Sequence, residues 1–324
     1  MAEAPLPRLG ALGASFSDDI ILAPAVGDRD PATVRTPTAF GDDIPTGRAL
    51  VVRVRVTDHA ERGYTFDYRD SDAAVVGSPQ IALGPEAVAD ATARALCHAL
   101  GLEAVTDAVR DACRIELAPN SWVGSEPHDT SAPCVAFARA RVFDAALGAL
   151  GNAWPSRVGA GSCSLGAIVQ LRAPGHDAVN ETLPGGEGAT PSRAGRDAWP
   201  GPLGATLVAT TAAWVQATQS VREGSGGLGA RHGGRGIERQ YTVTRDAEAY
   251  VALDRISNPP HGIARAGPPQ PAELWLALPG EALQRVPAWV THAMPSGSTL
   301  VVKTAGGAGH GFPGWGVDWD PDDF

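Results

Sequence analysis

The chain has 324 residues, of which 26 are basic and 36 acidic, so its formal net charge at pH 7 is −10. This acidic balance argues against nucleic acid and anionic membrane surfaces as partners, and no apolar run is long enough to span a bilayer. The 39 glycines and 27 prolines favour a fold rich in loops and turns over a helical bundle.

The spacing of cysteines and histidines predicts no metal centre. The four cysteines, at positions 97, 113, 134 and 163, form no C-x-x-C pair, so we expect neither a zinc knuckle nor a thioredoxin-type site. No two of the eight histidines are four residues apart, as ligands on one helix face would be. We therefore expect no metal and no cofactor. Because no signal peptide is recognisable, we expect reduced thiols in a cytoplasmic protein.

Residues 1–47 are rich in Pro, Gly and Asp and predict an irregular arm with at most one short strand, near residues 19–23. Residues 48–56 come next, and their second half alternates apolar and basic side chains, which is typical of a half-buried strand. Residues 64–68 follow after a turn and predict the second strand of a hairpin.

Two segments predict the main helices. The first runs from residue 84 to about residue 100, with Pro85 in the first turn, where a missing N–H is tolerated. The second runs over residues 134–154, where apolar residues recur at helical spacing. A strand is expected between the two helices, at residues 111–117.

The last third of the chain is predicted to be rich in strands. We expect them at residues 240–243 and 248–253, as one pair, and at 274–278 and 299–303, as a second pair. Residues 317–324 carry four aspartates. They lack the glycine and the distal glutamate of a calcium loop, so we expect a frayed acidic tail.

Residues 180–239 form the stretch around which the chain is organised. Two glycine-rich runs, at residues 185–188 and 224–236, flank the apolar segment 203–215. Glycine lets another backbone or a ligand approach closely. The two runs therefore predict loops that meet at one site or at one subunit interface.

These motifs resemble the hydantoinase B/oxoprolinase family. The resemblance rests on Asn-Glu-Thr-Leu-x-Gly-Gly at residues 180–186, the glycine pattern of residues 224–239, Asp-Arg at 254–255 followed by residues 258–262, and residues 304–311. The fold expected from the pattern and the resemblance is α+β and rich in β-structure, with two main helices and long Gly/Pro-rich loops. It would form one domain over residues 48–316, with a sub-boundary near residue 158 left open.

The chain departs from the family pattern in three places. Val135 and Phe137 stand where relatives carry Asn and Glu at the start of the second helix. Residues 206–211 hold no histidine, although relatives carry a His-x-x-Asn-Thr-like motif there. The N-terminal His/Asp metal cluster of the carboxylase relatives has no counterpart in this sequence.

The predicted site is centred on Glu181, as general acid or base, with Asn180 to orient and polarise the substrate and His176 as the alternative base. A polar loop without catalytic role is the alternative for this neighbourhood. The expected substrate-binding residues are the glycine-loop groups, whose N–H donors could form an anion nest, and two arginines that could hold a carboxylate. They are Gly185, Gly186, Ser225, Gly226, Gly227, Arg235 and Arg239.

Two classes of function stay open. The first is an enzyme acting on a small cyclic amide, imide or related carbonyl substrate by C–N hydrolysis or ring opening or closing, with bacterial secondary metabolism as a candidate setting. The second is a non-catalytic scaffold or regulatory subunit of an amidohydrolase or carboxylase complex. No phosphate-binding loop is present, so the resemblance implies a separate hydantoinase A-like subunit for any use of ATP. Tryptophans in Pro/Gly loops, Trp199, Trp289 and Trp315, predict exposed patches and hence a homo-oligomer.

Overall fold

The computed structural model describes residues 14–21, 49–59, 63–74, 82–126, 132–198, 206–208 and 212–313. The chain forms two compact units. Unit 1 contains Met1–Ile20, Leu50–Gly161 and Thr190–Arg193, and unit 2 contains Ile21–Ala49, Ser162–Ala189 and Ala194–Phe324. Most of the predicted arm and all of the predicted acidic tail lie outside the described residues.

Unit 1 holds a four-stranded sheet in the order β1-β2-β3-β4. The strands are β1 (Ala14–Ile21), β2 (Ala49–Asp58), β3 (Tyr64–Asp67) and β4 (Cys113–Glu116). The hairpin expected at β2 and β3 is confirmed, because the two strands pair antiparallel with Val56 opposite Phe66. Val52, Val54 and Val56 of β2 are buried while Arg53 and Arg55 are exposed, so the alternation in the sequence does indicate a half-buried strand.

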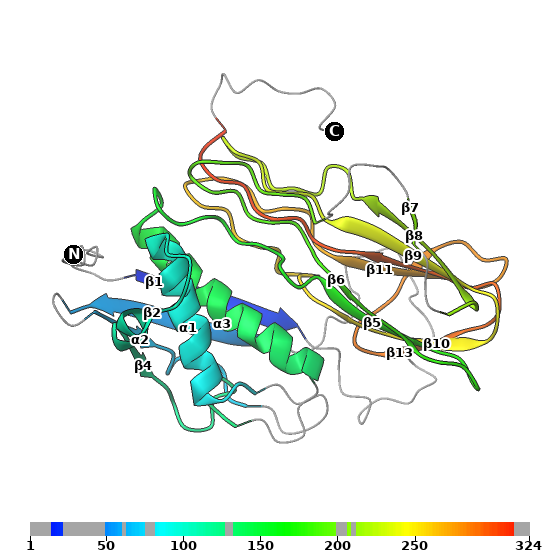
Figure 1. Ribbon diagram of the computed structural model, residues 1–324, viewed down its shortest axis with the longest axis horizontal. Helices are drawn as coiled ribbons and strands as arrows, with labels where there is room; N and C mark the ends of the chain where they lie inside the picture. Colours follow the sequence, from blue (N-terminus) through cyan, green and yellow to red (C-terminus); the bar gives the residue numbers. More distant parts are fainter. Residues whose placement is uncertain are drawn as a thin grey trace. The chain divides into compact units, whose positions relative to one another are not determined.

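The helices of unit 1 are α1 (Pro85–Leu100), α2 (Asp107–Asp111) and α3 (Ala132–Ala153). Both predicted main helices are confirmed, whereas the short α2 was not anticipated. Helix α1 begins directly after Gly84 and ends at Leu100, and the next residue, Gly101, caps it with a left-handed φ of 71°. Helices α1 and α3 lie side by side in Figure 1 and contact each other along their length.

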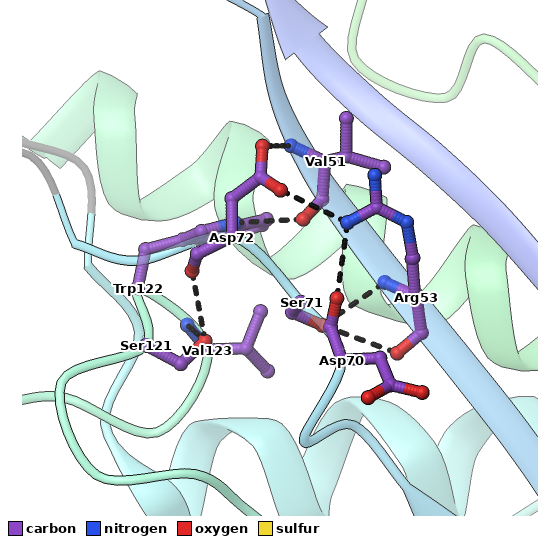
Figure 2. Close-up of polar contacts among 8 residues, drawn as sticks. All are labelled: Val51, Arg53, Asp70, Ser71, Asp72, Ser121, Trp122 and Val123. Carbon is purple, nitrogen blue, oxygen red and sulfur yellow. Dashed lines mark hydrogen bonds and ion pairs between the residues drawn. The ribbon is translucent and has the colours of Figure 1, made fainter.

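Residues 70–72, after β3, bind β2 through side chains that bond its backbone groups, as a paired strand would do (Figure 2). One carboxylate oxygen of Asp72 accepts a hydrogen bond from the Val51 backbone N–H at 3.0 Å, and the other accepts from the Arg53 guanidinium at 2.9 Å. The Ser71 hydroxyl accepts from the Arg53 N–H at 2.9 Å and donates to the Arg53 carbonyl at 3.1 Å. Asp72 and Ser71 therefore satisfy backbone groups of β2 beyond the point where β3 pairs with it.

The same segment also anchors the loop before α3. The Ser121 hydroxyl donates to the Asp72 carbonyl at 3.1 Å, and the Trp122 indole donates to the Val51 carbonyl at 3.2 Å (Figure 2). Trp122 and Val123 are fully buried. We call residues 70–72, with their hydrogen bonds to β2 and to Ser121, the Asp72 latch. It joins segments that are about fifty residues apart in the sequence.

We expect Asp72→Ala to lower the free energy of unfolding by about 1–2 kcal/mol, because it leaves the Val51 N–H without its acceptor. The ion pair with Arg53 is half exposed and adds little to this figure. The matched control is Asp70→Ala, because only the backbone carbonyl of Asp70 takes part in the latch. Urea denaturation should leave Asp70→Ala within about 0.5 kcal/mol of the wild type, and equal losses in both variants would rule out the latch.

Unit 2 is built from two antiparallel sheets. One has the strand order β13-β10-β5-β6 and the other the order β12-β11-β14-β9-β8-β7. The strands are β5 (Ala167–Arg172), β6 (Val179–Leu183), β7 (Thr206–Val208), β8 (Val215–Val221), β9 (Ile237–Val243), β10 (Ala247–Leu253), β11 (Glu273–Ala277), β12 (Gln284–Arg285), β13 (Thr291–Met294) and β14 (Thr299–Lys303). The fold is therefore α+β and rich in strands, as predicted.

One strand pairing differs from the expectation. Strands β11 and β14 pair with each other as predicted, with Trp275 opposite Val301. Strands β9 and β10 were also expected to pair, but β9 pairs with β14 and β8, whereas β10 pairs with β13 and β5. The short turn between them crosses from one sheet to the other, so sequence neighbours become members of facing sheets.

Three glycine-rich segments of unit 2 are joined by backbone hydrogen bonds, and we call residues 185–189, 225–236 and 305–311 together the glycine junction. The Gly307 N–H donates to the Gly234 carbonyl at 2.8 Å, and the Gly227 N–H donates to the Gly307 carbonyl at 2.9 Å. The Gly234 N–H in turn donates to the Glu187 carbonyl at 2.8 Å. The prediction that the glycine-rich runs meet is confirmed.

Candidate functional site

Glu181 lies in β6 and links the two sheets of unit 2. Its neighbours Val179 and Leu183 are buried while Asn180 and Thr182 are exposed, so strand alternation turns Glu181 towards the interior. Its carboxylate accepts three hydrogen bonds from the Arg239 guanidinium, at 2.7, 2.7 and 3.0 Å, and one from the Tyr241 hydroxyl at 2.7 Å. Arg239 and Tyr241 are two residues apart in β9 and therefore project from the same face.

Glu181 and Arg239 form a largely buried ion pair. The Arg239 side chain is 2% exposed and the Glu181 side chain 22% exposed. Burial lowers the pKa of the Arg239 guanidinium, but the hydrogen bonds to Glu181 and Tyr241 outweigh it, so the pKa is raised. Burial and the Glu181 carboxylate raise the pKa of the Tyr241 hydroxyl. Tyr241 therefore stays a neutral donor, and Arg239 stays a cation that needs its counter-charge.

The structure does not bring Asn180 and His176 to Glu181. Asn180 lies on the opposite face of β6, where its side-chain oxygen accepts from the Gln170 amide at 2.8 Å. His176 is exposed in the turn between β5 and β6 and contacts Arg245. Consecutive strand residues point to opposite faces, so Asn180 and Glu181 face opposite sides of β6, and their shared role at one substrate stays a prediction.

The glycine-loop N–H groups predicted to bind an anion are already used within the protein. Gly185 N–H donates to the Cys163 carbonyl at 2.7 Å, Gly186 N–H to the Ala305 carbonyl at 3.0 Å, and Gly227 N–H to the Gly307 carbonyl at 2.9 Å. These three donors are bonded to carbonyl oxygens, so an anion would have to displace those hydrogen bonds to use them as the predicted nest.

Ser225 and Gly226 also have structural surroundings. The Ser225 hydroxyl donates to the Arg222 carbonyl at 2.6 Å and accepts from the Gly236 N–H at 2.9 Å, and the residue is fully buried. A Cβ on Gly226 would lie 2.2 Å from the Gly233 carbonyl oxygen. This position therefore has to be glycine to let two backbones pass, which explains it without a ligand.

Arg235 is bound to two carboxylates of its own unit. Its Nε and Nη2 donate to one oxygen of Asp197 at 3.1 and 2.8 Å, and its Nη1 donates to Glu223 at 2.5 Å. The hydrogen bond to Asp197 is the main cause that raises the pKa of the Arg235 guanidinium. Like Arg239, Arg235 offers its guanidinium to protein carboxylates, in place of the substrate carboxylate that the sequence suggested.

Sequence reasoning missed Tyr241 and Asp197. They lie 60 and 38 residues from the groups that they bind, and no local motif marks them. The only available signal was the alternation of β9, which places residues 237, 239, 241 and 243 on one buried face and so makes Arg239 a buried charge that needs a partner.

Three further expectations can be compared with the described part of the chain. Trp289 was expected in an exposed patch, but it is 6% exposed and its indole donates to the Leu253 carbonyl at 2.9 Å; Trp199 and Trp315 lie outside the described residues. Within the described ranges, no three His, Cys, Asp or Glu side chains are grouped as metal ligands would be. Nor do those ranges contain a helix with the length and apolar character needed to traverse a membrane.

The fold and this cluster define an α+β protein whose second unit holds two antiparallel sheets, an interior Glu–Arg–Tyr cluster and a glycine junction. The Hydantoinase B/oxoprolinase family model matches residues 28–313. The chain belongs to the hydantoinase B/oxoprolinase family. A comparison with the curated proteins gave no match.

Two solved structures share the fold. The nucleotide-free structure of an acetone carboxylase, from work on ATP-dependent acetone carboxylation, is 12% identical with a TM-score of 0.66, over 92% of this chain and 45% of that chain. The ATP-dependent caprolactamase from Pseudomonas jessenii is 16% identical with a TM-score of 0.64, over 93% of this chain and 52% of that one. This chain thus spans about half the length of each of these proteins.

Proposed function

We propose that this chain is a non-catalytic hydantoinase B-like scaffold or regulatory subunit of an assembly that acts on a small carbonyl or cyclic amide substrate. The proposal rests on the hydrogen bonding of Glu181. Its carboxylate accepts four hydrogen bonds from Arg239 and Tyr241. A carboxylate held in this way ties two sheets together. It is a poor proton carrier, because taking up a proton would leave Arg239 buried without a counter-charge.

A second candidate function is that the chain itself catalyses the opening or closing of a cyclic amide or imide, with Glu181 as acid or base. Two observations favour it. One structural neighbour is named for its action on caprolactam, a cyclic amide, and the Glu181 side chain keeps 22% of its surface exposed. In this case substrate would have to replace Tyr241 or part of Arg239 at the carboxylate.

The proposed partners are argued from the same comparison. Both structural neighbours are described as ATP-dependent, and this sequence holds no phosphate-binding loop. We propose that a separate hydantoinase A-like subunit would supply any ATP hydrolysis. A homo-oligomer without bound cofactor or metal remains our proposal for this chain itself; light scattering at micromolar concentration and elemental analysis of chelator-free protein test the two parts.

The exposed residues of the predicted site test whether Asn180 and His176 act on substrate. If the chain is a scaffold, Asn180→Ala and His176→Ala should leave turnover of the assembled enzyme within about twofold of the wild type. If Asn180 and His176 act on substrate, each loss should cost about a hundredfold. Both residues are exposed, so neither substitution is expected to unfold the protein.

The measurement uses the chain alone and the chain co-expressed with a hydantoinase A-like subunit, with caprolactam and acetone as substrates and with or without ATP. Thr182→Ala is the matched control, because Thr182 is exposed on the same face of β6 as Asn180. Turnover of either substrate by the chain alone would overturn the scaffold proposal, and loss of that turnover in Asn180→Ala but not in Thr182→Ala would assign Asn180 to the site.

A further inference from the structure

The three helices of unit 1 bring three arginines to one carboxylate. Asp90 and Arg94 lie one turn apart on α1. Arg110 lies in the last turn of α2, and Arg139 lies in α3. Helix α1 packs against both of the other helices, so these side chains, which are far apart in the sequence, meet at one place. We call the four residues the arginine cluster.

The three guanidinium groups share the Asp90 carboxylate. The Arg94 Nε donates to Asp90 Oδ2 at 2.7 Å, the Arg110 Nη2 donates to Oδ1 at 3.3 Å, and the Arg139 Nη1 lies 4.0 Å from Oδ2. The pKa of the Asp90 carboxyl is lowered, mainly by the hydrogen bond from Arg94, so Asp90 is charged at neutral pH. The cluster therefore carries an excess of two positive charges, in a chain whose formal net charge is −10.

Most hydrogen-bond donors of the cluster are not used within the described part of the chain. A guanidinium has five N–H groups, but Arg94 donates through Nε alone and Arg110 through Nη2 alone. Arg139 is too far from Asp90 for a hydrogen bond. Among the described residues, Asp90 is the only acid paired with any of the three arginines. The Nη1 and Nη2 atoms of Arg94 therefore form an edge that can bind an oxyanion with two hydrogen bonds.

The cluster presents its positive charges to solvent. The side chains of Arg94, Arg110 and Arg139 are 58%, 48% and 50% exposed, whereas the Asp90 side chain is 20% exposed. An anion that approaches from solvent thus meets guanidinium groups before it meets the carboxylate. Exposed ion pairs add little stability, and the guanidinium groups repel one another, so folding alone gains little from this arrangement.

The ligand chemistry that fits the cluster is a phosphate group. Near neutral pH a phosphate group carries a charge of about −1.5 to −2 and three strong acceptor oxygens. These match the excess charge of the cluster and its three donor groups. A carboxylate has one negative charge and two oxygens, so it would compensate the cluster only in part. The planar fork of arginine is also suited to phosphate oxygens.

We propose that the arginine cluster binds a phosphate group, either as inorganic phosphate or as the phosphate of a small phosphorylated molecule. Arg94, Arg110 and Arg139 donate to the phosphate oxygens, and Asp90 holds Arg94 and Arg110 in position for this contact. The inference goes beyond the proposed function and uses no residue of unit 2, so each of the two can fail without the other.

Isothermal titration calorimetry of the full-length protein tests the proposal, at an ionic strength of about 0.1 M and a pH at which phosphate is a dianion. We expect one inorganic phosphate to bind per chain, and to bind at least about tenfold more weakly in 1 M salt, which screens exposed charges. Arg94→Gln and Arg110→Gln should each weaken binding at least about tenfold, because each removes charge-assisted hydrogen bonds. Both side chains are exposed, so circular dichroism should show that both variants are folded.

Arg157→Gln is the matched control. Arg157 is exposed and follows the end of α3 by four residues, and that end is about 20 Å from Arg139 along the helix. A charge at this distance is beyond the screening length of about 10 Å, so the variant should bind phosphate within about twofold of the wild type.

Titration with glycerol phosphate separates the two sources of the phosphate group. Binding of either probe supports the proposal, and the tighter of the two indicates whether the free ion or an ester is the ligand. Failure of both probes to bind would overturn the proposal, as would acetate that binds as tightly as phosphate. Affinities that Arg94→Gln and Arg110→Gln leave unchanged, or that Arg157→Gln weakens equally, would also overturn it.

Discussion

Gly307→Ala is expected to lower the free energy of unfolding by about 4 kcal/mol or more, which makes it one of the two most damaging changes that we predict. A Cβ at this position would lie 2.0 Å from the Glu187 carbonyl oxygen. Backbone cannot move aside as a flexible side chain can. The new methyl group must therefore push apart segments that Gly307 joins by its hydrogen bonds to Gly234 and Gly227.

The measurement is urea denaturation together with a thermal melt, in which we expect the midpoint to fall by about 10 °C or more. Gly267→Ala is the matched control, because the nearest atom to its Cβ would be at 3.5 Å and its backbone is not left-handed. That variant should stay within about 1 kcal/mol of the wild type. If Gly307→Ala is equally stable, the close packing of the glycine junction is not what holds these segments together.

Much of the fold could be predicted because its signals are local. The alternating valines and arginines of β2 and the helical spacing of α3 depend on residues a few positions apart, and the structure confirms both elements. Strand β6 was missed, because its sequence Val-Asn-Glu-Thr-Leu runs into a Pro-Gly-Gly turn and was taken as part of a glycine-rich loop. The crossing between β9 and β10 could not be predicted, since a three-residue turn fits a hairpin as well as a change of sheet.

The candidate site was predicted less well, and the reason is geometric. The motif at residues 180–186 drew attention to Glu181, which does lie at a charged cluster. The motif also suggested that Asn180 is its companion, although adjacent strand residues point apart. The true companions, Arg239 and Tyr241, come from the other sheet. Arg239 was named from the sequence as a ligand for a substrate carboxylate, and in the structure its guanidinium binds the carboxylate of Glu181.

The second large effect is expected for Glu181→Gln, which should lower the free energy of unfolding by about 3 kcal/mol. The amide keeps the volume and one acceptor oxygen but removes the charge. The Arg239 guanidinium is then left 2% exposed without a counter-ion, and its Nη1 is already buried with no hydrogen-bond acceptor among the described residues. Neither the Tyr241 hydroxyl nor solvent can replace the lost carboxylate, because burial excludes water from the guanidinium.

Glu238→Gln provides the matched comparison, because Glu238 lies in the same strand and pairs with Lys303 at 3.2 Å with both side chains about one-third exposed. That pair is screened by water, so its loss should cost less than about 1 kcal/mol. Urea denaturation of both variants, together with turnover of the assembled enzyme, distinguishes the two functions of Glu181. A large loss of stability in Glu181→Gln alone supports the structural ion pair. A variant as stable as the wild type that turns over about a hundredfold more slowly would identify Glu181 as the catalytic acid or base, and the chain as the enzyme itself.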